Sequence, residues 1–164
     1  MAQFKVGDGV VYAPHGAGKV IDTVHRDDAW GEYLSIQIVQ SSLTLMVPAD
    51  AAEEKGVRPA IKASEVEQLL ETMRSAPNEL AENGIERGKI AAERIRSGDT
   101  ELLAGIVRDY RGRVLAGSKL TATELRTVTA AKAALASEIA VATNVDLDAA
   151  LERLEQAIAV EIED

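Results

Sequence analysis

FKVGDGVVYAPHGAGKV, residues Phe4–Val20, sets the architecture of the first third of this chain. Valines and a tyrosine, which favour strands, occupy two short runs on either side of a turn. Four glycines punctuate these runs, at positions where the backbone must bend sharply or approach another segment closely. The stretch therefore predicts two short strands around a glycine-rich turn.

Part of the same stretch resembles a phosphate-binding loop. Residues 13–20, APHGAGKV, place Gly18 and Lys19 as such a loop would, but Val20 stands where a hydroxyl is needed to bind magnesium. The chain also continues as a strand after Val20, whereas a phosphate loop opens a helix whose N-terminus holds the anion. We therefore predict the first hairpin of a small β-barrel and no nucleotide site.

Further strands follow at short intervals. Residues 18–25, 33–39 and 43–47 alternate or run apolar, and Pro48 ends the last of them because it has no N–H to donate to a ladder. A short helix is expected at 49–55, and Val57-Arg58 is a candidate to return to the sheet. Four or five strands within about 45 residues predict a small SH3-like or Tudor-like barrel.

The pattern becomes helical after residue 63. Two capping boxes, Ser64–Glu67 and Thr121–Glu124, are expected to open helices, and Asp99 and Asp146 are expected to cap two others. The helices are expected over about 64–73, 79–96, 100–116, 121–142 and from 147 onward. Gly84 and Gly88 weaken the second of these, so it is expected to fray or to start late. The predicted fold class is α+β, with a barrel over residues 1–60 and an all-α bundle over residues 64–164.

Composition limits the possible functions. The 164 residues include no cysteine, which excludes a disulfide framework and a thiol nucleophile, and no apolar run approaches the length of a membrane span. His15 and His25 do not match the spacing of a metal site, and no motif of a catalytic nucleophile is present. We therefore expect a cytoplasmic, non-enzymatic protein without cofactor, metal, membrane or small-molecule substrate.

Charge is distributed unevenly along a chain whose net charge is −9. Residues 87–132 contain ten basic and five acidic side chains, whereas residues 133–164 contain eight acidic side chains and one arginine. The basic middle is consistent with a phosphate-facing patch, and also with ordinary solvated helix faces. Charge alone leaves both interpretations open.

Several strings, taken in order, resemble the CarD/CdnL family of bacterial transcription regulators. The N-terminal strings are FKVGDGVVY (4–12), HGAGK (15–19), EYL (32–34), LTLMVP (43–48) and GVR (56–58). The helical half adds SGD (97–99), VRD (107–109) and LTATELR (120–126). The resemblance covers almost the whole chain, and its first part is also similar to the polymerase-interacting module of the transcription-repair coupling factor.

The resemblance implies a non-catalytic regulator of RNA polymerase. In that family the barrel docks on the polymerase β subunit along an exposed strand edge, and the helical domain contacts promoter DNA, where a tryptophan wedges into the minor groove and stabilises the open complex. Carried onto this chain, the polymerase-binding residues are Arg26, Leu45, Met46, Val47 and Pro48. The DNA-binding positions are Gly84, Arg87, Lys89 and Arg126.

Some of these positions differ from the family pattern. Gly84 occupies the tryptophan position, and Met46 takes a place that is often arginine. The one tryptophan, Trp30, falls in a barrel loop, where it is either an anchor for a partner or a lid on the barrel. Two alternatives thus accompany the main hypothesis: a diverged paralogue that docks on polymerase but binds DNA weakly, and a Tudor-like module with an unrelated partner.

Overall fold

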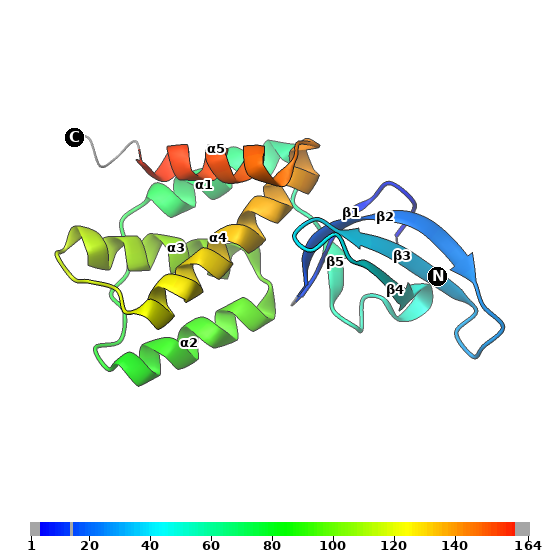
Figure 1. The fold of residues 1–164 in the computed structure, drawn as a ribbon, viewed down its shortest axis with the longest axis horizontal. Helices are drawn as coiled ribbons and strands as arrows, with labels where there is room; N and C mark the ends of the chain where they lie inside the picture. Colours follow the sequence, from blue (N-terminus) through cyan, green and yellow to red (C-terminus); the bar gives the residue numbers. More distant parts are fainter. Residues whose placement is uncertain (1–3, 14, 160–164) are drawn as a thin grey trace.

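A computed structural model describes residues 4–13 and 15–159, and it has an antiparallel sheet followed by helices (Figure 1). The strands are β1 (Gly9–Tyr12), β2 (Gly16–His25), β3 (Glu32–Ile38), β4 (Thr44–Pro48) and β5 (Val57–Pro59). The helices are α1 (Val66–Arg74), α2 (Gly84–Ser97), α3 (Thr100–Leu115), α4 (Ala122–Thr143) and α5 (Leu147–Ala159), with short 3-10 turns at Ala49–Ala51 and Ala63–Glu65. The predicted α+β class is confirmed.

The sheet is open, so the prediction of a barrel is wrong in that respect. Its strand order is β4-β3-β2-β1-β5, and among the described residues β4 pairs only with β3 and β5 only with β1. Closure would require β4 and β5 to pair with each other. β5 has three residues and ends at Pro59, which cannot donate to a ladder, and the chain then turns toward the helices.

The predicted first hairpin is present. β1 and β2 pair antiparallel from Gly9 opposite Lys19 to Tyr12 opposite Gly16. Gly16 has a φ of 99°, in the left-handed region that a residue with a side chain rarely adopts. Lys19 lies inside β2, between β1 and β3, so no helix begins after it and the geometry of a phosphate loop is absent.

Most helix ends follow the expected caps. Asp99 accepts from the N–H of Leu102 at 3.0 Å, and the Thr121–Glu124 capping box has both of its bonds. Asp146 accepts from the N–H of Ala149 at 2.7 Å. The second helix starts late, at Gly84, because the Asn83 side chain accepts from the N–H groups of the first turn.

The capping box predicted at Ser64–Glu67 is wrong. Ser64 lies within the 3-10 turn, and the Glu65 carboxylate instead accepts from the N–H of Lys62 at 3.0 Å. α1 begins after Glu65 without a side-chain cap bond of its own. Its apolar face, rather than a cap, fixes it against the bundle, since Val66, Leu70 and Met73 are buried.

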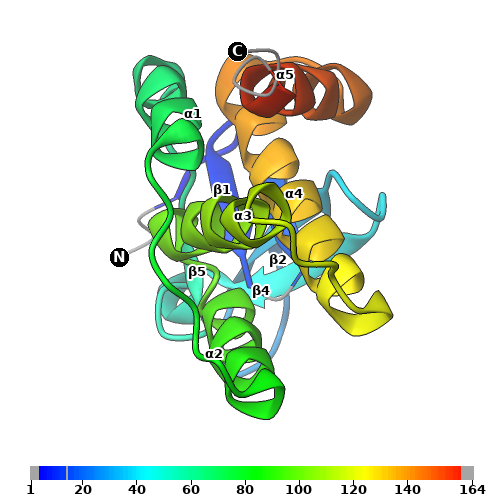
Figure 2. The same ribbon diagram turned by 90° about the vertical axis from the view of Figure 1, so that its left-hand side faces the viewer.

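Helix α4 is the centre of the molecule, with α3 and α5 packed against it and its C-terminal end reaching the sheet (Figures 1 and 2). Leu135 and Ile139 of α4 are fully buried in the core of the bundle. Two residues after Ile139, Val141 packs with Val11 and Ala17 of the sheet. The sheet and the bundle therefore share a packed junction.

Candidate functional site

Strand β4 forms one open edge of the sheet. Val47 is 2% exposed and Leu45 is half-buried against the same core, so alternate residues of the strand fix it onto the sheet. Met46, between them, is half-buried and pairs with Ser35 of β3. Because β4 has no second neighbour among the described residues, its outer edge presents backbone groups that another strand could pair with. Pro48 ends this edge.

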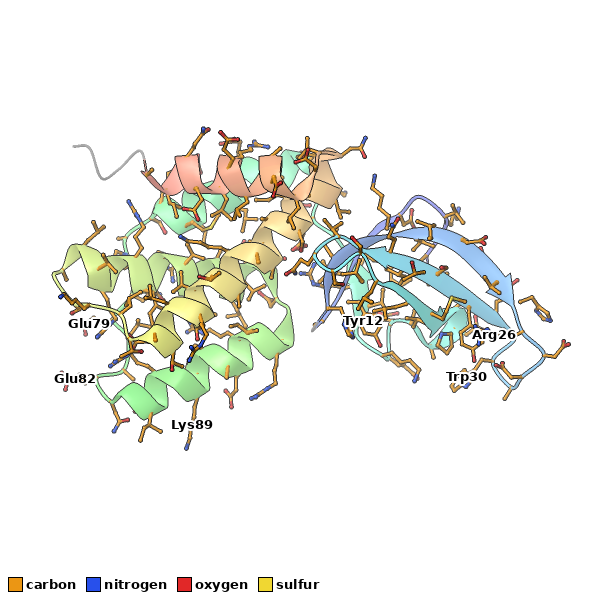
Figure 3. All side chains as sticks on the ribbon, viewed as in Figure 1. Tyr12, Arg26, Trp30, Glu79, Glu82 and Lys89 are labelled. Atoms are coloured by element: carbon orange, nitrogen blue, oxygen red, sulfur yellow. The ribbon has the colours of Figure 1, made fainter. Side chains whose placement is uncertain are left out.

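The loop between β2 and β3 lies at the end of the sheet farthest from the helices (Figure 3). Asp28 orders this loop by accepting from the N–H of Trp30 at 2.9 Å and from the Tyr33 hydroxyl at 2.8 Å. The bond from Tyr33 lowers the pKa of Asp28 below its ordinary value. The Arg26 guanidinium lies over the Tyr33 ring, and the Lys55 ammonium over the Trp30 ring.

Trp30 is therefore held at the surface and does not cover the sheet core. The residue is 49% exposed, and it is absent from the buried sheet cluster. This position does not fit a lid on the sheet core, and a role as an anchor for a partner stays a prediction. Arg26, also exposed, lies on the same loop (Figure 3).

The predicted DNA-binding positions lie on the far side of the molecule, at the beginnings of α2 and α4. Gly84 is the first residue of α2 and is exposed, and a Cβ placed on it would meet only the Arg87 guanidinium, at an ordinary 3.5 Å. Lys89 points away from the bundle (Figure 3). Arg126, near the start of α4, is exposed and bonds weakly to Thr123 at 3.3 Å.

Arg87 is placed differently from its neighbours. Its side chain is 10% exposed and forms an ion pair with Glu124, at 2.9 Å from Nη2 to Oε1. The same guanidinium donates to the carbonyl oxygens of Ala81 and Glu82. These bonds tie the loop before α2 to the beginning of α4.

The pKa of Glu124 reflects this environment. Burial raises it, but the N–H of Thr121 and the Arg87 guanidinium more than compensate, so the pKa lies below its ordinary value. Glu124 is consequently ionised, and its carboxylate accepts hydrogen bonds from both the N–H of Thr121 and the Arg87 guanidinium. The Arg87–Glu124 pair therefore stabilises the fold next to the predicted DNA-binding positions.

The basic middle of the chain is partly internal. Asp109 of α3 is 2% exposed, and it accepts from Arg108 at 2.7 Å and lies 3.8 Å from Arg94. It also accepts from the N–H of Asn78 at 2.9 Å. Several basic side chains of residues 87–132 therefore form ion pairs inside the bundle. The basic residues of this segment form neither a continuous basic patch nor a plain solvated face.

Two apolar side chains beside the predicted DNA-binding positions are exposed, and one of them, Leu125, is interpreted from the sequence as a core residue, which is wrong. Ile85, next to Gly84, is 74% exposed, and Leu125, next to Arg126, is 54% exposed. Both occur among other apolar residues of predicted helices, so no sequence signal separates them from core residues. The structure brings apolar and cationic side chains together at these two helix starts.

Neither a membrane-spanning helix nor a group of metal-binding side chains is present within residues 4–13 and 15–159. No helix there is long and apolar enough to cross a membrane. No three His, Asp or Glu side chains of that part of the chain gather where they could hold a metal ion.

Comparisons with known proteins cover both halves. Residues 4–61 match the family described as CarD-like/TRCF RID domain, and residues 68–155 match the one described as CarD, C-terminal domain. A relative from Bacillus subtilis (strain 168), named "Putative transcription factor YdeB", is 26% identical over 141 residues, covering 84% of this chain and 91% of the relative. Because the second match alone covers more than half of the chain, this protein belongs to the CarD-like family.

Proposed function

We propose that this protein is a non-catalytic transcription regulator that binds the RNA polymerase β subunit through β4 and alters the stability of the promoter open complex through its helices. The match of residues 4–61 to a polymerase-interacting domain type and the name of the Bacillus relative support the regulatory role. The single observation that carries the docking mode is the open β4 edge.

Docking is proposed to occur by strand addition. A strand of the partner would pair with the free backbone groups of β4, while side chains at its rim select the partner. Leu45 and Val47 hold the edge in place from the core side, and Met46 and Arg26 would contact the partner. The open sheet suits this role better than a closed barrel, which has no edge to offer.

DNA contact is proposed at the starts of α2 and α4. Lys89 and Arg126 are exposed cations that could hold phosphates without regard to sequence. Arg87, which is paired internally, would position the start of α2 instead of binding phosphate itself. Ile85 and Leu125 would supply the apolar contact that Gly84 lacks, because exposed aliphatic side chains can hold distorted base steps.

A second candidate is a diverged regulator that docks on polymerase with little DNA contact. The observations that favour it are Gly84 in place of a wedge and the internal use of Arg87. Open-complex lifetime on a promoter, measured with the protein's own polymerase, separates the two. A change in lifetime supports the first, whereas binding to the β subunit without a change supports the second. Absence of binding to the β subunit would contradict both and leave an interaction module with another partner.

Gly84→Trp tests the DNA-facing position by gain of function. The site is exposed and open, so the added side chain should not disturb the fold. We expect a longer open-complex lifetime, by about fivefold if the indole stabilises the melted junction by about 1 kcal/mol. Gly88→Trp, at an equally open position one turn along α2, is the matched control. Equal effects of the two variants would contradict a specific contact at residue 84.

Met46→Arg tests the docking edge. Met46 is half-buried on β4, and a guanidinium there could reach an acidic group beside the added strand. We expect affinity for the isolated β-subunit lobe to rise by about threefold, corresponding to a rim charge pair of less than about 1 kcal/mol. Thr44→Arg places the same side chain two residues away on the same strand. If Thr44→Arg raises affinity as much as Met46→Arg does, the gain comes from added positive charge on the protein and not from a specific contact at residue 46.

A further inference from the structure

We propose that Arg58 and Glu138 are positioning residues, which hold the sheet and the helical bundle at one fixed mutual orientation. This inference rests on the proposed function, because the orientation matters only if the β4 edge and the starts of α2 and α4 act on one polymerase–promoter complex. The sequence places Arg58 in a candidate strand and in the GVR string, but it gives neither Arg58 nor Glu138 a role in orienting the two halves.

The Glu138 carboxylate joins segments that are far apart in the chain. It lies on α4, its side chain is 3% exposed, and Arg58 of β5 reaches it with both terminal nitrogens, at 2.8 and 3.1 Å. It also accepts from the Thr100 hydroxyl at 2.6 Å and from the N–H of Ile61 at 3.2 Å. One buried carboxylate thus contacts β5, the segment after it and the start of α3.

Arg58 completes the connection from the sheet side. Its guanidinium donates to the carbonyl oxygen of Gly98 at 2.6 Å and to the Thr100 hydroxyl at 2.9 Å, at the turn between α2 and α3. Gly98 has a φ of 65° and closes α2. The helix that carries Gly84 and Lys89 is therefore anchored at its other end to the sheet.

The rest of the junction consists of apolar packing and of single hydrogen bonds, from the N–H of Ala17 to the Ser137 hydroxyl oxygen and from Lys19 to Asn144, which specify orientation less sharply. Val11, Ala17 and Val141 form a small buried group between the sheet and α4. Small aliphatic contacts tolerate sliding, whereas bidentate bonds between Arg58 and Glu138 have a narrow range of geometry. Buried polar groups are known in some proteins to select one arrangement among several of similar stability.

Fixed orientation has a direct consequence for a protein with two contact surfaces. Once β4 is docked, DNA contact becomes intramolecular, and its effective concentration depends on whether the helix starts can reach the promoter. A loosened junction would lower that concentration without changing either surface.

The test uses the full chain with Arg58→Met and Glu138→Leu combined, because apolar replacement of a buried ion pair normally preserves folding. We expect affinity for the β subunit to stay within about twofold of the unmodified protein, and the effect on open-complex lifetime to fall about tenfold. Spin labels on Cys introduced at Glu54 and Glu93, both exposed, should give a narrow distance distribution in the parent and a broad one in the variant.

A disulfide supplies the rescue that separates positioning from other roles. A Cβ built on Gly9 lies 3.9 Å from the Cβ of Val141, the separation that a disulfide requires, and the chain has no other cysteine. In the double variant, Gly9→Cys with Val141→Cys should restore the lifetime effect when oxidised by diamide and lose it again on reduction.

Three outcomes would overturn the proposal: an unchanged distance distribution, a broad distribution with an unchanged lifetime effect, or failure of the oxidised disulfide to restore the effect. If the unmodified protein itself leaves the lifetime unchanged, the proposed function is wrong. The distance distribution then decides by itself whether Arg58 and Glu138 fix the orientation.

Discussion

Each end of helix α4 has an arginine–glutamate pair, and the two pairs hold different things together. Near the N-terminus, Glu124 pairs with Arg87 of α2 at 2.9 Å, with both side chains about one-tenth exposed. Toward the C-terminus, Glu138 pairs with Arg58 of β5 at 2.8 Å, with exposures of 3% and 33%. The first pair lies within the bundle, and the second joins the bundle to the sheet.

The difference shows that the same kind of ion pair can stabilise either a local part of the bundle or the contact between the bundle and the sheet. Glu124 also caps its own helix through Thr121, so it retains partners when Arg87 is removed. Among residues 4–13 and 15–159, the partners of the Glu138 carboxylate all come from other segments, 38 to 80 positions away. Loss of the first pair should therefore loosen one corner of the bundle, and loss of the second should leave a deeply buried carboxylate without its countercharge.

Arg58→Ala should have the largest effect. It leaves the Glu138 carboxylate buried with only the Thr100 hydroxyl and the Ile61 N–H, and stranding a buried charge costs about 3 kcal/mol. Urea denaturation should show this as a lower free energy of unfolding. The combined Arg58→Met and Glu138→Leu variant should recover part of the loss. If the double variant is as unstable as Arg58→Ala, the cost comes from lost packing and not from the stranded charge.

Arg87→Ala should have the second-largest effect and lower the free energy of unfolding by about 2 kcal/mol. Glu124 keeps its cap bond to Thr121, but the carbonyl oxygens of Ala81 and Glu82 lose their donor. Hydrogen exchange should accelerate mainly at residues 81–90, while the sheet remains protected. Lys89→Ala, at an exposed position on the same helix, is the control and should change stability by less than about 0.5 kcal/mol. Loss of protection in the sheet would contradict the local character of this pair.

Thr121→Ala should have a smaller effect, because it removes only the bond that the N–H of Glu124 donates to the Thr121 hydroxyl oxygen. The expected loss is about 1 kcal/mol, which thermal unfolding can measure. Thr127→Ala, inside the same helix, deletes the same group where alanine is the better helix former and should be neutral or slightly stabilising. Equal losses at both positions would mean that the cap bond contributes little.

The smallest effect should be the dependence on pH. The pKa of Glu124 is lower in the folded protein than its ordinary value of 4.5, so its contribution to stability is present above that value and is lost as pH falls through the folded pKa. Between about pH 5 and pH 3, the unmodified protein should lose more stability than Glu124→Gln. Parallel losses in the two proteins would show that other carboxylates dominate in this range.

Local sequence signals determined most of the elements. The hairpin of β1 and β2 follows from glycines among β-branched residues, and the caps at Asp99, Thr121 and Asp146 follow from side chains that bond to N–H groups a few positions along the chain. Such interactions depend on neighbours within one turn, so they can be read without knowing the fold. Ser64 failed as a cap because a competing bond from Lys62 to Glu65 formed a 3-10 turn around it.

Only the tertiary structure decided the rest. Whether the sheet closes depends on where β5 ends and the chain turns away. Whether an arginine is exposed or paired depends on acidic residues far along the sequence. Glu124 pairs with Arg87 in this way, and Glu138 pairs with Arg58. Charge pairing and edge pairing are long-range interactions, and they do not depend on the spacing of residues along the chain. The sequence by itself therefore determined the elements and the family resemblance, while the packing of α4 against β1 and β2 decided which charges face outward and how the two halves are joined.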